Sequence, residues 1–448
     1  MTTSNQTERV IARVMLGQLL FVAGNSLTVG GFFNFFVSRF DPTAFLFAVA
    51  MIVPETSQSL SVLGRVILRW SPQRKRNWIG FLIAGRMAAM LLPVADLLER
   101  SQSSLFDPMT FILVCTGIWY LCQGIAYVNY ISWLSDLVPE VRWGRLLSRR
   151  QMASLFVSLG FPLVATLLRD RWLKGLSPEA EAWSFAVLFL VGGMLTLTSI
   201  FPLLSFPEVP LARSISETRR EGFVPGEQEA VRLVGVRTRT FTTSFLKLVA
   251  ARWWLAFFQG LTQAVLFFYA TRTLSISLTT YTVLTSIMVL SQFPMAALAG
   301  RCCDHFGEKW ALILGMLMTS TAMLFWMMAS SEQWYWLIPA YLLWGGFGLI
   351  NVCGPSLCLK LAPPSDNTTH FALYDQCSGL IAGLAGLLGG MLLDRMGQEV
   401  WGISPYIVLF GISWLGRVTA PFWLMTLRQP KMENSLQSVP DGSAVTAH

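Results

Sequence analysis

Twelve apolar stretches, each about 20 residues long or more, run through this 448-residue chain and limit its fold more than any other feature. A helix of about 20 mainly apolar residues crosses the hydrocarbon core of a bilayer, and it satisfies its own backbone hydrogen bonds there. Charged residues make up only 13% of the chain, against roughly 25% in soluble domains. We therefore predict an all-α membrane protein with twelve transmembrane helices. The predicted spans are 11–37, 44–68, 77–97, 109–135, 151–168, 183–204, 249–271, 278–300, 309–329, 334–360, 372–393 and 402–426.

The basic residues are distributed unevenly between the predicted loops. With the N-terminus placed in the cytoplasm, 23 of the 33 Lys and Arg residues fall in cytoplasmic segments. Such a bias sets the orientation of membrane proteins, so we predict that both termini are cytoplasmic. The first apolar run is too long for a signal peptide and lacks a small-residue cleavage site, and we expect it to be an uncleaved span.

The second part of the chain repeats features of the first. Leu137-Val-Pro139 follows the fourth predicted span, and Leu361-Ala-Pro363 follows the tenth. Internal repeats of this kind are typical of secondary transporters. We therefore predict two pseudo-symmetric six-helix halves. The predicted parts are an N-terminal half (1–204), a cytoplasmic linker (205–245), a C-terminal half (246–430) and a disordered cytoplasmic tail (431–448).

A loop motif of the form G-x-x-x-D-x-x-G-x-K lies between the eighth and ninth spans. It consists of Gly300, Arg301, Asp304, Gly307 and Lys309. This motif resembles the loop motif of the major facilitator superfamily. The stretch from Asp136 to Arg145 also resembles the loop after the fourth span in many bacterial members.

The matching loop of the first half keeps Gly64 and Arg65 but has Leu68 where the motif has Asp. The resemblance implies a gating role for the residues of both loops, because contacts at such helix ends break and reform as the halves rock. The alternative is that Arg301 and Asp304 only anchor the membrane interface. The resemblance also implies a bacterial plasma (inner) membrane as the location.

Uncharged polar residues lie on spans one, four, seven and ten, which the resemblance places around a central cavity. The candidate cavity residues are Asn25, Asn34, Gln123, Tyr127, Tyr130, Gln259, Gln263, Tyr341, Trp344 and Asn351, with Gln18 also on span one. The spacings of Gln123, Tyr127 and Tyr130 place them on one helix face. Amides and phenols beside aromatic rings suit a polar uncharged ligand or an amphipathic one. For each single residue, hydrogen bonding between helices is the alternative.

Two charged residues lie near the middle of their spans, where a charge is costly and suggests function. Glu55 follows Pro54 in span two and is the candidate proton carrier, since burial raises the pKa of a carboxyl group. The alternatives are a structural ion pair with Arg86 of span three, or a Glu that lines a wet cavity without coupling. We expect Arg86 to be a structural partner rather than a substrate ligand, and Arg417 to snorkel towards the cytoplasm.

The sequence has no motif for covalent catalysis, nucleotide binding or metal binding. None of the seven Cys residues has C-x-x-C spacing, and neither a P-loop nor a G-x-S-x-G motif is found. We therefore expect no enzyme activity, no cofactor, no metal and no nucleic-acid partner.

The predicted function is secondary active transport of a small organic solute by alternating access, with protons as a candidate coupling ion. The degenerate first-half loop keeps open a transporter-like receptor or scaffold that binds without transport. A membrane-embedded lipid-handling protein is a further alternative. We expect a monomer whose other partners are membrane lipids.

Overall fold

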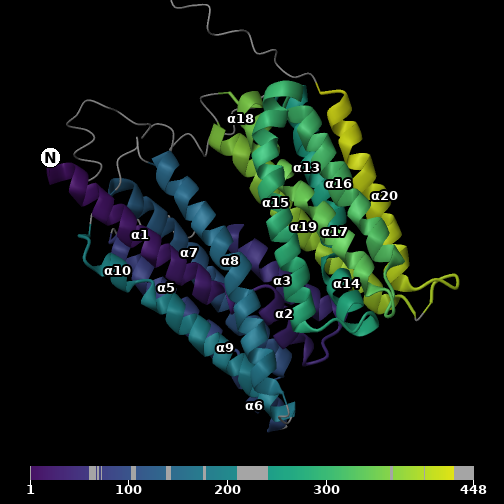
Figure 1. Cartoon of the computed structure of the whole chain (residues 1–448), viewed down its shortest axis with the longest axis horizontal. Coiled ribbons are helices and arrows are strands. Elements are labelled where there is room, and N and C mark those ends of the chain that lie inside the picture. The colour runs from purple at the N-terminus through teal and green to yellow at the C-terminus, as the bar shows by residue number, and fades with distance from the viewer. Residues whose placement is uncertain are drawn as a thin grey trace, which may run out of the picture.

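The computed structural model describes residues 2–59, 67, 70–71, 73–101, 107–137, 143–174, 178–208, 241–363, 367–397 and 399–427. These residues form a bundle of twelve helical columns (Figure 1). Each column is either one helix or a run of consecutive short helices. We call the part up to residue 208 the N-terminal half and the part from residue 241 the C-terminal half. The predicted linker and tail fall mostly outside the described residues.

The first six columns make up the N-terminal half. They are α1 (Thr2–Ser26) with α2 (Gly31–Ser38), α3 (Ala44–Ser59), α5 (Arg74–Leu91) with α6 (Val94–Arg100), α7 (Pro108–Leu137), α8 (Trp143–Leu173), and α9 (Pro178–Thr198) with α10 (Phe201–Leu204).

The last six columns make up the C-terminal half. They are α13 (Thr243–Leu261) with α14 (Gln263–Phe268) and the π-helix η3 (Tyr269–Thr273), α15 (Leu278–Phe306), α16 (Glu308–Met328), the column of η4 (Trp334–Trp336), α17 (Leu337–Leu343), η5 (Trp344–Gly346) and α18 (Phe347–Leu361), α19 (Asn367–Arg395) and α20 (Pro405–Met425).

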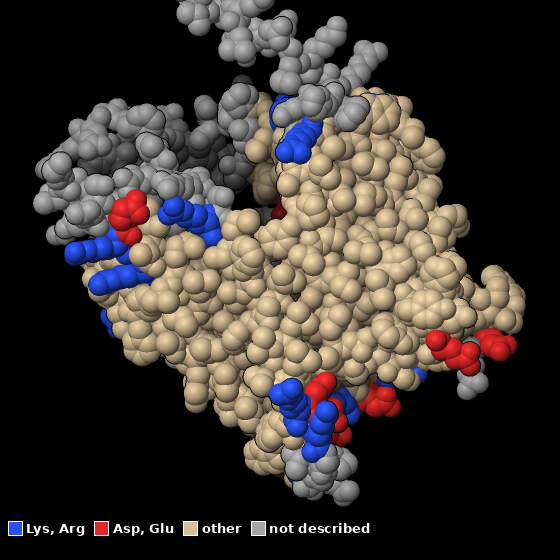
Figure 2. All heavy atoms as spheres, viewed as in Figure 1, with Lys and Arg blue, Asp and Glu red and all other residues tan. Residues whose placement is uncertain are grey.

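Ten of the described columns are long and apolar enough to cross a membrane. The other two are the column of α3, whose apolar part Ala44–Pro54 is shorter, and the column of α13, which breaks at Thr262. Figure 2 shows charged residues at the two ends of one face, with almost none in the broad band between them. The predicted all-α membrane fold is confirmed, and the protein is an integral multi-pass membrane protein.

The first column of each half breaks in the same way. The hydroxyl group of Thr28 donates a hydrogen bond to the backbone oxygen of Asn25 (3.0 Å), and that of Thr262 donates one to the backbone oxygen of Gln259 (3.3 Å). Both threonines are fully buried. The side chain of Thr28 or Thr262 therefore takes up a carbonyl group at each break, and an amide residue stands three positions before it.

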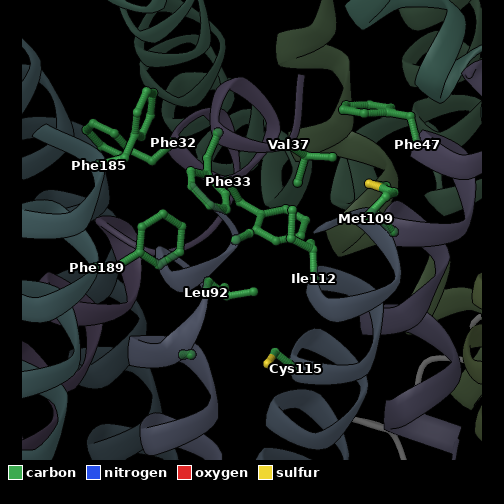
Figure 3. Packing of buried hydrophobic residues seen from close by; sticks show 14 of the residues in the cluster. Phe32, Phe33, Val37, Phe47, Leu92, Met109, Ile112, Cys115, Phe185 and Phe189 are labelled. Atoms are coloured by element: carbon green, nitrogen blue, oxygen red, sulfur yellow. The ribbon is translucent and has the colours of Figure 1, made fainter. Parts of the chain in front are cut away.

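Among the described residues, a hydrophobic core joins the two halves at one end of the molecule. We call this end, where residues 39–43 and 394–404 lie, the far end, and the opposite end, near residues 208 and 241, the linker end. One buried cluster at the far end contains Phe36 and Phe47 of the first half together with Phe267 and Phe268 of the second. Figure 3 shows the part of this cluster in the N-terminal half, with Phe47 beside Met109 and Ile112. At the linker end each half has a separate core.

The surface agrees with this arrangement of the cores. Figure 2 shows the molecule hollowed between the halves at the linker end, which is uppermost in Figures 1 and 2. The halves are therefore closed together at the far end and separate at the linker end.

Glycines in α19 allow this helix to pack closely against both halves. A Cβ atom on Gly390 would lie 2.5 Å from the backbone oxygen of Ala44 in α3, and one on Gly389 would lie 1.8 Å from that of Leu261 in α13. Real Cβ atoms do not approach backbone oxygens so closely. The glycine-rich sequence of α19 is thus explained by helix packing.

Candidate functional site

A buried arginine links the first, third and fourth columns of the N-terminal half. Arg86 of α5 is 1% exposed, and its Nη2 donates to Oδ1 of Asn25 (2.8 Å) and to Oε1 of Gln123 (2.8 Å). The guanidinium group also lies over the rings of Phe21 and Trp119, at 5.3 and 5.2 Å. Its Nε and Nη1 have no hydrogen-bond partner among the described residues.

The amide groups of Asn25 and Gln123 are oriented by this contact. Oε1 of Gln123 also accepts a hydrogen bond from Nε1 of Trp119 (3.2 Å). Because the oxygen atoms face Arg86, the nitrogen atoms point elsewhere. Neither nitrogen belongs to the fully buried, unpartnered atoms of the described chain. Both residues thus present N–H donors at an accessible surface.

A second arginine makes a similar link two helix turns nearer the linker end. Arg150 of α8 donates from Nε and Nη2 to Oε1 of Gln18 (3.1 and 2.7 Å) and lies over the ring of Tyr130 at 5.5 Å. The amide nitrogen of Gln18 donates to Ser154 (2.9 Å). Arg150 directly precedes the predicted span 151–168, so the sequence alone places it in a cytoplasmic loop. The polar residues that face it on spans one and four were the signal that could have located it.

The two links form a continuous polar surface that we call the polar ladder, made of Gln18, Asn25, Gln123, Tyr127 and Tyr130. Gln18 and Asn25 are seven residues apart on α1, and so are Gln123 and Tyr130 on α7, which is about 10 Å along each helix. Tyr127 lies between the level of the Arg86 contacts and the level of the Arg150 contacts, and it is 58% exposed. The structure therefore brings together four of the predicted cavity residues, Asn25 and the three on α7.

The remaining predicted cavity residues do not form such a group. Asn34 of α2 is buried and hydrogen-bonds Tyr281 of α15. Tyr341 is also buried, and its ring lies 4.8 Å from that of Trp344 in an aromatic core of the C-terminal half.

Three amide residues of the C-terminal half complete this set. Gln263 and Asn351 are exposed, and Nε2 of Gln259 is buried without a partner among the described residues.

Arg417 is buried, so the expectation that it snorkels is wrong. It is 2% exposed, and its Nη2 donates to Oγ1 of Thr262 (2.8 Å) and to the backbone oxygen of Phe258 (3.4 Å). Ser413 donates to the same oxygen (2.6 Å). These donors satisfy backbone groups that the break between α13 and α14 leaves free.

The predicted proton-coupling and gating residues are described only in part. The side chains of Glu55 and Asp304 lie outside the described residues, as do Gly64 and Arg65 altogether. Gly300 lies within α15, and Arg301 is exposed on it. Gly307 precedes α16 with a φ of 81°, a left-handed conformation that favours glycine.

Lys309 of the same motif caps the C-terminal end of the neighbouring helix α20. Its Nζ donates to the backbone oxygens of Met425 (2.8 Å) and Leu427 (3.1 Å), at and just beyond the end of α20. In the N-terminal half, Lys75 donates in the same way to the backbone oxygens of Leu204 and Phe206 (both 2.7 Å), after α10. The basic residues of both loops thus satisfy carbonyl groups at a helix C-terminus.

Polar contacts between the halves gather at the far end. Both carboxylate oxygens of Asp394 in α19 accept hydrogen bonds from the backbone of α3, from the N–H groups of Ala44 and Phe45 (2.8 Å each). Arg272 forms an ion pair with Asp41, and Thr279 donates a hydrogen bond to Asp170. These contacts would have to break before the far end could open.

Comparisons with known proteins agree with this architecture. The sequence model described as Major Facilitator Superfamily matches residues 253–446. A search of curated proteins finds no significant match.

Solved structures match the fold of nearly the whole chain. A bacterial homologue of the iron transporter ferroportin in an inward-facing state has a TM-score of 0.66 at 15% identity, over 93% of this chain and 98% of that one. A mutant of the nucleoside transporter NupG gives 0.65 at 12% identity, over 94% and 100%. The xylose transporter XylE from E. coli, inward open, gives 0.61 at 17% identity, over 95% and 97%. The C-terminal part of the chain therefore matches the Major Facilitator Superfamily by sequence, and nearly the whole chain shares the fold of these transporters.

Proposed function

We propose that the protein is a secondary active transporter that moves a small organic solute by alternating access between its halves. The observation that carries this proposal is that the halves share a core and polar contacts at the far end but have separate cores at the linker end. A polar ladder lies on the N-terminal half between these two levels. Closure at one end with polar groups within is the geometry that alternating access requires.

The orientation in the membrane is part of the proposal. We assign the linker end to the cytoplasm because the basic residues concentrate there, and the inward-facing states of two matching transporters support this assignment. A bacterial inner membrane, cytoplasmic termini and a monomer bounded by lipid complete it. The parts 1–204 and 246–430 would move as two bodies joined by 205–245.

Flux into proteoliposomes tests transport directly. A transporter takes up a labelled solute that binds it, and an excess of unlabelled solute on the opposite side accelerates the exchange. Retained binding without flux of any solute would contradict the proposal and favour a receptor or scaffold.

Proton coupling through Glu55 is a separate proposal. It rests on a carboxyl group that follows Pro54 in a membrane-spanning helix. In Glu55→Gln we expect uptake driven by a pH gradient to fall by at least tenfold, while exchange without a gradient continues, because the neutral amide carries no proton. Unchanged gradient-driven uptake would remove Glu55 from the mechanism.

A further inference from the structure

We infer that the polar ladder binds a small organic anion, such as a carboxylate or phosphate ester. The anion contacts both the residues held by Arg86 and those held by Arg150. This inference rests on the proposed transport function and names the chemical class of its substrate. It departs from the uncharged or amphipathic ligand expected from the amides and phenols alone.

Arg86 and Arg150 have no acidic partner among the described side chains. Other arginines near the ends of the spans do have one. Arg39 pairs with Asp96 (2.9 Å), Arg169 with Glu181 (3.1 Å), and Arg252 with Asp375 (3.7 Å). A cation held within the bundle without a counter-ion is costly, and an incoming anion would offset that cost.

The helices that carry the ladder have few acidic residues. The helices that carry the ladder and Arg150 are α1, α7 and α8, and their only acidic residues are Glu8, Asp136 and Asp170. Glu8 is ten residues from Gln18 along α1, Asp136 is six residues from Tyr130 along α7, and Asp170 is twenty residues from Arg150 along α8. On the neighbouring α3 the only acidic residue is Glu55, whose side chain lies outside the described part. Along α1, α7 and α8, therefore, no described acidic side chain lies next to the ladder.

The free hydrogen-bond donors of the ladder and of Arg150 also favour an anion. Arg86 holds the oxygens of Asn25 and Gln123, so their N–H groups are free to donate to a ligand. Nη1 of Arg150 makes no hydrogen bond to a described residue and is not among the fully buried, unpartnered atoms. Free donors at both levels select a ligand with several acceptor oxygens.

The length of the polar ladder indicates the size of the ligand. The two levels are about 10 Å apart along the helices, and the exposed ring of Tyr127 lies between them. A bare inorganic anion would reach only one level. An organic anion places its charged group at Arg150, its body against Tyr127 and its other oxygens at Asn25 and Gln123.

Arg417 shows that burial of an arginine alone does not indicate an anion site. It is as buried as Arg86, but it donates to Thr262 and to the backbone oxygen of Phe258 at a helix break. Its hydrogen bonds complete the fold of the C-terminal half. Those of Arg86 and Arg150 end on side-chain amides of the ladder.

Matched pairs of charged and neutral solutes test the inference with the full-length protein in neutral detergent. The probes are glucose 6-phosphate and glucuronate against glucose, and benzoate against benzamide. We expect at least one anion, and not its neutral partner, to raise the melting temperature, because a ligand that binds the folded state stabilises it. Equal stabilisation by the neutral partners, or none by any anion, would overturn the inference.

Arg150→Gln and Arg149→Gln provide a matched pair of variants. Arg149 is the exposed neighbour on the same helix. We expect the dissociation constant of the stabilising anion to rise roughly tenfold or more in Arg150→Gln and to stay within about twofold of the parent in Arg149→Gln. Should Arg150→Gln fail to fold, Arg150→Lys keeps the charge but loses the fork, and it should show a smaller rise. Equal effects of Arg149→Gln and Arg150→Gln would contradict the inference.

Two further outcomes keep this inference separate from the transport proposal. Flux of glucose or benzamide without preference for the anions would overturn the anion site and leave transport standing. Anion binding that depends on Arg150, but without flux, would support the site and contradict transport. Phosphatidylglycerol is the other source of an anionic group, and stabilisation by this lipid alone would overturn the inference.

Discussion

Arg86 shows how a single buried cation is accommodated in a membrane-spanning bundle. Its Nη2 makes two hydrogen bonds to amide oxygens, and its flat faces lie against two aromatic rings. Two of its nitrogens remain without partners in the described part of the chain. A group with such incomplete satisfaction adds little to stability, so its value lies in the orientation that it imposes on Asn25 and Gln123.

Replacing Arg86 by Met should separate stability from function. The unbranched Met fills part of the space beside Phe21 and Trp119 and removes a poorly solvated charge. We expect an apparent melting temperature within about 2 °C of the parent, and transport reduced at least tenfold, because the two amides are free to rotate. Thermal denaturation and proteoliposome flux measure the two effects. A large loss of stability with normal flux per folded molecule would show that the role is structural.

At the scale of helices, the loops after the second and eighth predicted spans share a role that the motif alone did not reveal. Lys75 closes the end of α10, and Lys309 closes the end of α20. The end of α20 has a second lysine, because Nζ of Lys247 donates to the backbone oxygen of Thr426 (3.2 Å). Two lysines therefore donate to the end of α20, and one lysine donates to the end of α10.

Removal of the lysines should reveal this difference. In Lys75→Ala we expect faster hydrogen exchange in residues 201–206, and in Lys309→Ala a smaller change in residues 422–427, because Lys247 remains. The double variant Lys247→Ala with Lys309→Ala should match the effect of Lys75→Ala. Each lysine contributes about 0.5–1 kcal/mol at such an end. A larger effect of Lys309→Ala than of Lys75→Ala would contradict this account.

For the whole molecule, the far end is the region that must change in the proposed transport cycle. Asp394 accepts two backbone hydrogen bonds from α3, which places a carboxylate at a helix N-terminus across the two halves. Such a cap stabilises a helix by about 1 kcal/mol. Here it also stabilises the far-end-closed state, because the cap and the helix belong to different halves.

Asp394→Ala should shift the balance between the two states. We expect roughly a fivefold change in their ratio in favour of the far-end-open state. The amide protons of Ala44 and Phe45 should exchange faster, as hydrogen exchange with mass spectrometry would measure. Asp394→Asn keeps one acceptor oxygen and should lie between the parent and Asp394→Ala. Unchanged exchange at both residues would show that the contact does not hold the far end closed.

Much of the architecture could be predicted from the sequence, because length and hydropathy decide which segments span a membrane. The all-α fold was predicted in this way, whereas the resemblance to the superfamily rested on the loop motif. The breaks at Thr28 and Thr262 were not, since each depends on one hydroxyl group and its neighbours. Arg150 was assigned to a loop because a charge at the first turns of a span looks the same in sequence whether it faces water or another helix.

The site was predictable only where helical spacing was informative. The shared face of Gln123, Tyr127 and Tyr130 was visible in the sequence, and the structure places these residues on one ladder with Asn25 of α1. The partners of Arg86 could not be predicted, because they come from columns one and four, and only three-dimensional packing brings them to column three.

The cap that Asp394 forms on α3 has a consequence for how this contact can vary among related sequences. The carboxylate binds backbone N–H groups, which every residue except proline provides. Ala44 and Phe45 can therefore change without loss of the contact, whereas Asp394 cannot. Methods that detect contacts from paired substitutions should miss this one, because a change on one side requires no compensating change on the other. An acidic residue kept at this position, beside a first turn of α3 free to vary except to proline, would be its only trace.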